Sequence, residues 1–177
     1  MLIPEEIIEK AKKIKLLLTD VDGVLTDGRI IYDSDGKELK FFHVRDGYGL
    51  RLLISSGIEV GIITGRNSSI VEKRAKELGI KHIFQSVYNK AEIIDKIMSL
   101  ENLENEAIAY VGDDIVDLPA FKKVGLKITV PDAPLEVQKY ADYITLNYPG
   151  KGAIREICEI ILKSKGLWEG ILASYLK

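Results

Sequence analysis

The sequence of 177 residues is 46% hydrophobic and 29% charged, which is enough apolar material for one globular domain with a sizeable core. Its formal net charge of −2 argues against a nucleic-acid-binding surface, which is typically strongly basic. No apolar run reaches the roughly 18 residues of a membrane span, and the amphipathic start MLIPEEIIEKAKKIK lacks the apolar core of a signal peptide. Because Cys158 is the only cysteine, no intrachain disulfide can form, and we expect a cytoplasmic protein.

Helix and strand patterns alternate along the chain. Pro4 suits a helix start, and Ile7, Ala11 and Ile14 follow at helical spacing, before a continuous apolar strand over residues 15–21. The later predicted elements, in chain order, are a helix over 46–56, a strand over 59–64, a helix over 68–78, a strand over 82–84, a helix over 90–100, a strand over 107–112, a helix over 114–123, a strand over 127–130, a short helix, a strand over 143–146 and a closing helix from Gly152. This alternation predicts a doubly wound, mainly parallel α/β sheet in a single domain over residues 1–177.

One segment departs from the alternation. Two short runs rich in β-forming residues, 30–32 and 39–44, flank the stretch DSDGK. Asp35-Gly36 within that stretch is a strong hairpin signal. We therefore expect a β-hairpin insertion over about residues 28–44 rather than a second domain.

Polar residues gather where the predicted strands end or the next helix begins. They are Asp20, Asp22, Thr64, Arg66, Lys90, Asp113, Asp114 and Asp117. The carboxyl ends of strands in an open α/β sheet form the edge where ligands bind, so we expect these side chains to converge in one crevice.

The residue types at this edge indicate phosphoryl chemistry. Clustered carboxylates without cysteine or histidine favour Mg²⁺, and a lysine with a hydroxyl beside that ion suits a phosphoryl group. Asp20 is a candidate nucleophile that would form an aspartyl-phosphate. Asp22, two residues on and on the same side of an extended segment, would protonate the leaving oxygen and then activate water.

The segments DVDGVLTDG, IITGR, Lys90 and VGDDIVD resemble, in order, the four motifs of the haloacid dehalogenase superfamily, which is mostly Mg²⁺-dependent phosphatases. The resemblance implies that Asp20 is the nucleophile, Asp22 the acid/base, and Thr64 and Lys90 the phosphate-binding pair. It implies metal ligation by Asp20, Asp113 and the main-chain carbonyl of Asp22. Asp114 and Asp117 are implied as supports around these ligands.

From Leu16 to about Ile161 the chain is similar to 3-deoxy-D-manno-octulosonate 8-phosphate (KDO 8-phosphate) phosphatases, which serve lipopolysaccharide precursor synthesis. FHVRDGYGLRLL, IEVGIITGR, YNK and GKGAIREIC carry this similarity. It implies a capless homotetramer whose hairpins help to close neighbouring sites, and a substrate with a phosphate and a carboxylate. The residues implied for substrate binding, besides Asp22 and Lys90, are His43, Val44, Arg45, Asp46, Gly47, Arg51, Arg66 and Arg74. Relatives often have arginine where Lys151 stands, which leaves its role open.

Other interpretations remain open for several of these features. An isolated D-x-D-G is an ordinary turn, Asp114 suits a helix cap, and Arg51 and Arg74 suit surface ion pairs. The alternative substrate is another 2-keto-3-deoxy sugar-acid phosphate, such as the nine-carbon analogue. The alternative from another class is a non-catalytic oligomerisation module like those of sugar-acid nucleotide synthetases.

Overall fold

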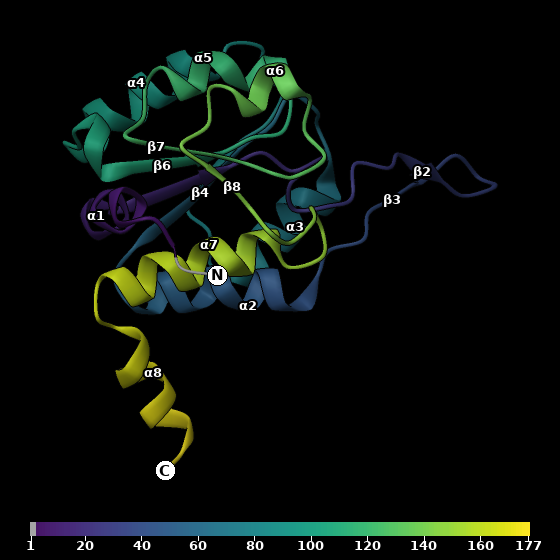
Figure 1. Cartoon of the computed structure of the whole chain (residues 1–177). Helices are drawn as coiled ribbons and strands as arrows, with labels where there is room; N and C mark the ends of the chain where they lie inside the picture. The colour runs from purple at the N-terminus through teal and green to yellow at the C-terminus, as the bar shows by residue number, and fades with distance from the viewer. Residues whose placement is uncertain (1–2) are drawn as a thin grey trace.

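The computed structural model describes residues 3–177, which are organised around one six-stranded sheet (Figure 1). Its strands lie in the order β5-β4-β1-β6-β7-β8, and every neighbouring pair is parallel. The strands are β1 (Leu16–Thr19), β4 (Glu59–Ile63), β5 (His82–Phe84), β6 (Ile108–Val111), β7 (Leu126–Thr129) and β8 (Tyr143–Ile144). Since the chain winds outward from β1 in both directions, the predicted doubly wound α/β fold is confirmed.

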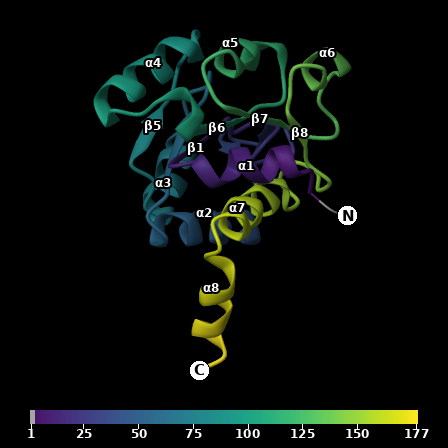
Figure 2. The ribbon, with the colours of Figure 1, turned by 60° about the vertical axis from the view of Figure 1, so that its left-hand side comes forward.

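Helices cover both faces of the sheet (Figures 1 and 2). One face packs against α1 (Glu5–Lys13), α2 (Val44–Ser55), α3 (Ser69–Leu78) and α7 (Ala153–Ser164). The other face packs against α4 (Lys90–Glu101), α5 (Leu118–Phe121) and α6 (Leu135–Gln138). Leu17 of β1 belongs to the first core, whereas Leu16 and Leu18 belong to the second. A strand buried on both faces needs apolar side chains at every position, which explains its continuous apolar run.

The predicted hairpin is present and projects from the body of the molecule (Figure 1). It consists of β2 (Ile31–Tyr32) paired antiparallel with β3 (Glu38–Leu39). Its second strand is shorter than the predicted 39–44, because the chain returns to the body after residue 39. There Phe42 packs against the core and α2 begins at Val44.

Two predicted helices differ in form. The helix expected over 114–123 is a 3₁₀ turn, η2 (Ile115–Asp117), followed by α5, and a further 3₁₀ turn, η1 (Asn105–Ala107), precedes β6. In η2 the Asp114 and Asp117 side chains bond backbone N–H groups, which tightens the turn. The closing helix divides into α7 and α8 (Trp168–Tyr175), separated by Gly166 with φ of 69°. Within residues 3–177, no helix is both long and apolar enough to span a membrane.

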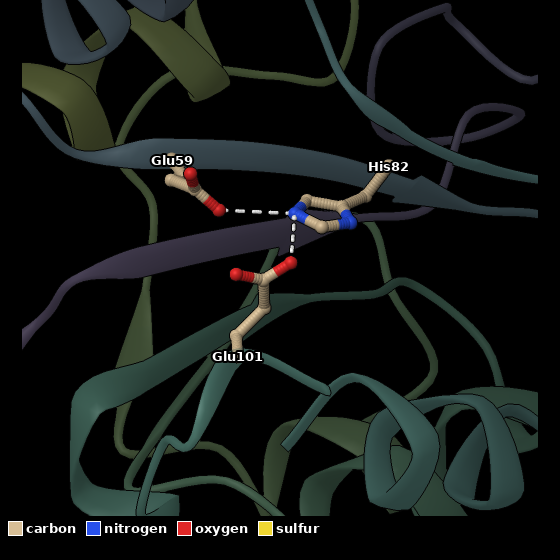
Figure 3. Close-up of side chains that lie close together, drawn as sticks. All are labelled: Glu59, His82 and Glu101. Atoms are coloured by element: carbon tan, nitrogen blue, oxygen red, sulfur yellow. Dashed lines mark hydrogen bonds and ion pairs between the residues drawn. The ribbon is translucent and has the colours of Figure 1, made fainter. Parts of the chain in front are cut away.

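At the amino ends of β4 and β5, three side chains meet on the edge opposite the predicted site (Figure 3). His82 Nε2 lies 3.0 Å from Glu59 Oε2 and 3.6 Å from Glu101 Oε1. Lys81 adds a contact of 3.3 Å to Glu59. The polar side chains of this cluster are therefore partners for one another, and their contacts join β4, β5 and α4.

Candidate active site

The predicted polar residues converge at the carboxyl ends of β1, β4 and β6. Asp20 follows β1, and its backbone N–H continues the sheet by donating to Val111 O at 3.0 Å. Thr64 follows β4 and is likewise held, by Phe84 O at 2.9 Å. Asp113 follows β6 after one glycine. The sheet register thus fixes three chemically important positions before any side chain contributes.

Lys90, the first residue of α4, is the hub of this site. Its Nζ donates to Asp20 Oδ2 at 2.7 Å and to Asp117 Oδ1 at 2.5 Å, and its side chain is 2% exposed. Burial lowers the pKa of Lys90, but attraction to Asp117 and Asp20 outweighs it, so the net pKa is raised. The lysine therefore stays charged and holds the two carboxylates together.

Asp117 is fully buried and serves as an acceptor for several donors. Besides Lys90, its Oδ1 accepts from Tyr110 Oη at 2.6 Å. Its Oδ2 accepts from the backbone N–H groups of Asp113 at 3.0 Å and Asp114 at 3.2 Å. Both oxygens are therefore occupied, which fits a supporting role better than metal ligation. The sequence reasoning missed Tyr110, although a tyrosine in a buried strand needs a partner for its hydroxyl.

Asp113 lies close to two other carboxylates, Asp117 and Asp20. Burial together with the nearby Asp117 and Asp20 raises its pKa to about 8. Gly23 makes room for its carboxylate, because a Cβ at Gly23 would lie 2.1 Å from Asp113 Oδ2. Gly23 also has φ of 88°, a conformation that glycine adopts at little cost.

This donor set fits a hard divalent cation. One carboxylate oxygen from each of Asp20, Asp113 and Asp117 lies within 4.8 Å of the others. Asp117 already accepts four hydrogen bonds, whereas Asp20 accepts two, from Val21 N at 2.6 Å and from Lys90 Nζ at 2.7 Å. A carboxylate has about four lone-pair sites, so Asp20 and Asp113 are the residues that would hold the ion, with oxygen ligands suited to Mg²⁺. A cavity of about 200 Å³ beside Gly23 and Asp113 leaves space for water ligands.

Asp22 is surrounded by charged side chains, of which the sequence analysis predicted Arg66 as a site residue. Lys40 Nζ bonds Oδ1 of Asp22, and Arg66 Nε lies 3.7 Å from its Oδ2. Glu38 accepts from Arg66 Nη2 at 2.7 Å and from Ser68 Oγ at 2.9 Å. Lys40 and Glu38 were missed by the sequence reasoning. Strand alternation offered a signal, because both charges fall on one side of a ribbon whose other side carries exposed apolar residues.

The remaining predicted substrate residues lie around the start of α2. Asp46 is buried and caps α7, accepting from Gly152 N at 3.2 Å and Arg155 N at 2.8 Å. His43 Nδ1 lies 3.8 Å from Asp46 and is a buried atom without a hydrogen-bond partner in the described chain. Val44 is the exposed first residue of α2.

Of the four predicted arginines, only Arg66 is joined to a site carboxylate by an ion pair within residues 3–177. Arg74 instead pairs with Glu77 at 3.3 Å and lies over Gly47. Arg45 lines a cavity of about 670 Å³ with Lys151 and Arg155. Arg51 lies on the exposed side of α2.

Two predicted site residues have clear local roles. Thr64 is buried, and its Oγ1 accepts from the Arg66 backbone N–H at 3.4 Å, which shapes the turn after β4. Asp114 caps η2 by accepting from Ile115 N at 2.7 Å. The capping alternative for Asp114 is therefore realised in the structure.

Comparison with known proteins supports the class that this geometry indicates. A family model described as haloacid dehalogenase-like hydrolase matches residues 31–130. The chain belongs to the haloacid dehalogenase-like hydrolases.

Sequence identity to individual relatives places the chain in one family within this class. The chain is 46% identical over 165 residues to 3-deoxy-D-manno-octulosonate 8-phosphate phosphatase KdsC of Escherichia coli K12, covering 93% of this chain and 87% of that protein. It is 44% identical over 169 residues to KdsC of Yersinia pestis, covering 95% and 90%. The chain therefore belongs to the 3-deoxy-D-manno-octulosonate 8-phosphate phosphatase family.

Solved structures agree with this placement. The phosphatase from Moraxella catarrhalis, crystallised with a magnesium ion, a phosphate ion and a KDO molecule, matches with a TM-score of 0.94 and 46% identity over 96% of this chain and 98% of that one. The cobalt-bound phosphatase from Haemophilus influenzae matches with a TM-score of 0.85 and 43% identity over 89% and 92%.

Proposed function

We propose that this chain is a Mg²⁺-dependent phosphatase that hydrolyses KDO 8-phosphate to KDO and phosphate, in lipopolysaccharide precursor synthesis. The observation that carries the proposal is the meeting of Asp20, Lys90 and Asp113 at one sheet edge in a chain 46% identical to a KDO 8-phosphate phosphatase. The nine-carbon sugar-acid phosphate remains the second candidate substrate.

The chemistry divides into two displacements at phosphorus. A carboxylate oxygen of Asp20 attacks, the bond from phosphorus to the sugar oxygen breaks, and Asp22 gives its proton to that oxygen. Water then attacks the aspartyl-phosphate, Asp22 takes a proton from the water, and phosphate leaves as Asp20 is regenerated. The bound cation neutralises phosphoryl charge and reduces its repulsion from Asp20.

The other site residues bind and orient the substrate in this proposal. Thr64 and Lys90 hold the phosphoryl group, and Asp113 holds the metal with Asp20 and the main-chain carbonyl of Asp22. Asp114 and Asp117 support these ligands. The residues that receive the sugar-acid portion in this proposal are His43, the first turn of α2 and four arginines, namely His43, Val44, Arg45, Asp46, Gly47, Arg51, Arg66 and Arg74.

We also propose that residues 1–177 form a single domain that assembles as a homotetramer through the hairpin. Exposed apolar side chains on the hairpin support this assembly, since an isolated two-stranded ribbon is marginal in water. A cytoplasmic location suits the buried free thiol of Cys158.

The experiment that tests the function is a phosphate-release screen over sugar phosphates, with Mg²⁺ and with a chelator. We expect preference for KDO 8-phosphate and loss of activity on chelation. Preference for the nine-carbon analogue would select the second substrate. Absence of release from every sugar phosphate would instead support the non-catalytic module.

A further inference from the structure

Lys40 is a partly buried residue whose side chain is almost wholly covered, in an otherwise exposed part of the chain. Its side chain is 2% exposed, whereas its neighbour Phe41 is 62% exposed. Lysine is rarely buried unless its charge is paired. The pairing partner is Asp22, whose Oδ1 bonds Lys40 Nζ across 18 residues of sequence. The Lys40 side chain is therefore buried where it reaches into the active site to bond Asp22.

Lys40 belongs to a closed arrangement of two cations and two carboxylates. Glu38 Oε1 lies 3.5 Å from Lys40 Nζ and accepts from Arg66 Nη2 at 2.7 Å. Arg66 in turn lies 3.7 Å from Asp22 through Nε and Oδ2. The base of the hairpin is thus joined to Asp22 from two sides.

The two oxygens of Asp22 differ sharply. Oδ1 is taken by Lys40, whereas Oδ2 is buried without a hydrogen-bond partner among residues 3–177. Arg66 Nε is also buried without a hydrogen-bond partner in that part of the chain. An oxygen atom about 2.8 Å from both atoms would satisfy them together, since their 3.7 Å separation allows it.

We propose that Lys40 is a positioning residue that holds Oδ1 of Asp22 and so presents Oδ2 as the proton-carrying oxygen. This inference rests on the proposed role of Asp22. In the first displacement the Oδ2 proton passes to the leaving sugar oxygen as its bond to phosphorus breaks. In the second, Oδ2 takes a proton from the attacking water. A fixed carboxylate orientation favours both transfers, because proton transfer requires close and directed contact.

The test compares Lys40→Met with Lys40→Arg, using Lys96→Met on the exposed side of α4 as the matched control. With KDO 8-phosphate and Mg²⁺, we expect Lys40→Met to lower kcat by about 10²-fold with KM changed less than about threefold. Lys40→Arg keeps a cation at Asp22 and should restore most of kcat, and Lys96→Met should match wild type. Unchanged kcat in Lys40→Met, or a rise in KM alone, would overturn the inference.

A double-mutant cycle asks whether Lys40 acts through Asp22. Adding Lys40→Met to Asp22→Asn should lower the remaining kcat by less than about threefold, because the group being positioned is already lost. A further loss of about 10²-fold would mean that Lys40 acts elsewhere and would overturn the inference. If Lys40→Met does not fold, Lys40→Arg and Lys40→Gln are compared in the same cycle.

The cycle also separates this inference from the proposed function. If wild type prefers another sugar phosphate, the cycle is run with that substrate and the inference stands or falls on it. If Asp22→Asn alone keeps full activity, both the role of Asp22 and the inference that rests on it are wrong.

Discussion

Lys90 Nζ lies 2.7 Å from Asp20 Oδ2, although the two residues are separated by 70 positions in the sequence. Burial raises the pKa of Asp20, the charge of Lys90 lowers it only in part, and the net pKa stays raised. A nucleophile needs an ionised carboxylate, and the lysine offsets part of the cost of keeping that charge away from water. The contact therefore connects the fold of the sheet directly with the proposed chemistry.

Asp20→Asn should abolish turnover while leaving the protein folded. The amide cannot form the aspartyl-phosphate and weakens the metal site, so we expect phosphate release to fall by about 10³-fold or more. Removing one member of a carboxylate cluster also relieves repulsion with Asp113, which should preserve thermal stability. Phosphate release and the melting temperature measure the two effects. Near-normal release would rule out the covalent mechanism.

Mg²⁺ affinity should increase with pH. The pKa of Asp113 is raised to about 8 by burial, Asp117 and Asp20, so below pH 8 the metal-free protein largely holds a proton there. Cation binding must displace this proton, and affinity should weaken by up to about tenfold per pH unit below 8. Calorimetric titration at pH 6, 7 and 8 measures the trend, with Asp113→Asn as control.

The same carboxyl sets a stability trend for the metal-free protein. Its folded pKa of about 8 exceeds the unfolded value of about 3.9, so the folded state binds the extra proton. The free energy of unfolding should therefore fall as pH rises between about 4 and 8 through this group. Asp113→Asn should flatten that part of the profile, and saturating Mg²⁺ should oppose the fall. Identical profiles for wild type and Asp113→Asn would contradict the assignment.

Tyr110→Phe should destabilise the core behind the site. The substitution removes the 2.6 Å hydrogen bond from Tyr110 Oη to the buried Asp117 side chain, which also bonds the charged Lys90. Bonds to charged groups contribute about 1.5–3 kcal/mol, so the free energy of unfolding should fall by about that amount. Urea unfolding measures it, with Tyr88→Phe as control because Tyr88 is 97% exposed. Equal stability of the two variants would show that Asp117 finds another donor.

The sequence predicted the sheet, the position of Thr64 at the end of β4 and the meeting of Asp20, Lys90 and Asp113, because buried strands and their polar ends are local patterns. It did not reveal Lys40 as a partner of Asp22, since that contact depends on how the hairpin returns to the body. The contacts of Arg45, Arg51 and Arg74 could not be predicted either, because they depend on how α2 and α3 pack against the rest of the chain.

Asp46 illustrates a different difficulty. Within the segment HVRDG the sequence predicts substrate binding for Asp46, and the structure adds a second role, because its carboxylate caps α7 more than 100 residues further along the chain. A helix cap supplied by a residue so far away in the sequence produces no local pattern from which it could be predicted. Sequence patterns therefore predict which residues lie at strand ends, but they do not reveal which distant element a polar side chain contacts.

Shortening the hairpin should disturb assembly and substrate selectivity together. The hairpin exposes Ile30, Tyr32, Leu39 and Phe41, whereas its bonds to the body come from Glu38 and Lys40 at its base. Replacing residues 33–37 with an Asn-Gly turn keeps that base but moves the tip. We expect an unchanged circular dichroism spectrum, a smaller species in sedimentation and weaker discrimination between sugar phosphates.

The reason is that a capless domain needs another surface to exclude water from the bound phosphate, and a neighbouring hairpin would supply it. The control is Tyr88→Ser, which removes an exposed aromatic ring outside the hairpin and should leave both assembly and selectivity unchanged. A wild-type protein that sediments as a monomer with full selectivity would contradict the proposed assembly. A shortened variant that keeps its oligomeric state but loses selectivity would instead place the hairpin over the site of its own chain.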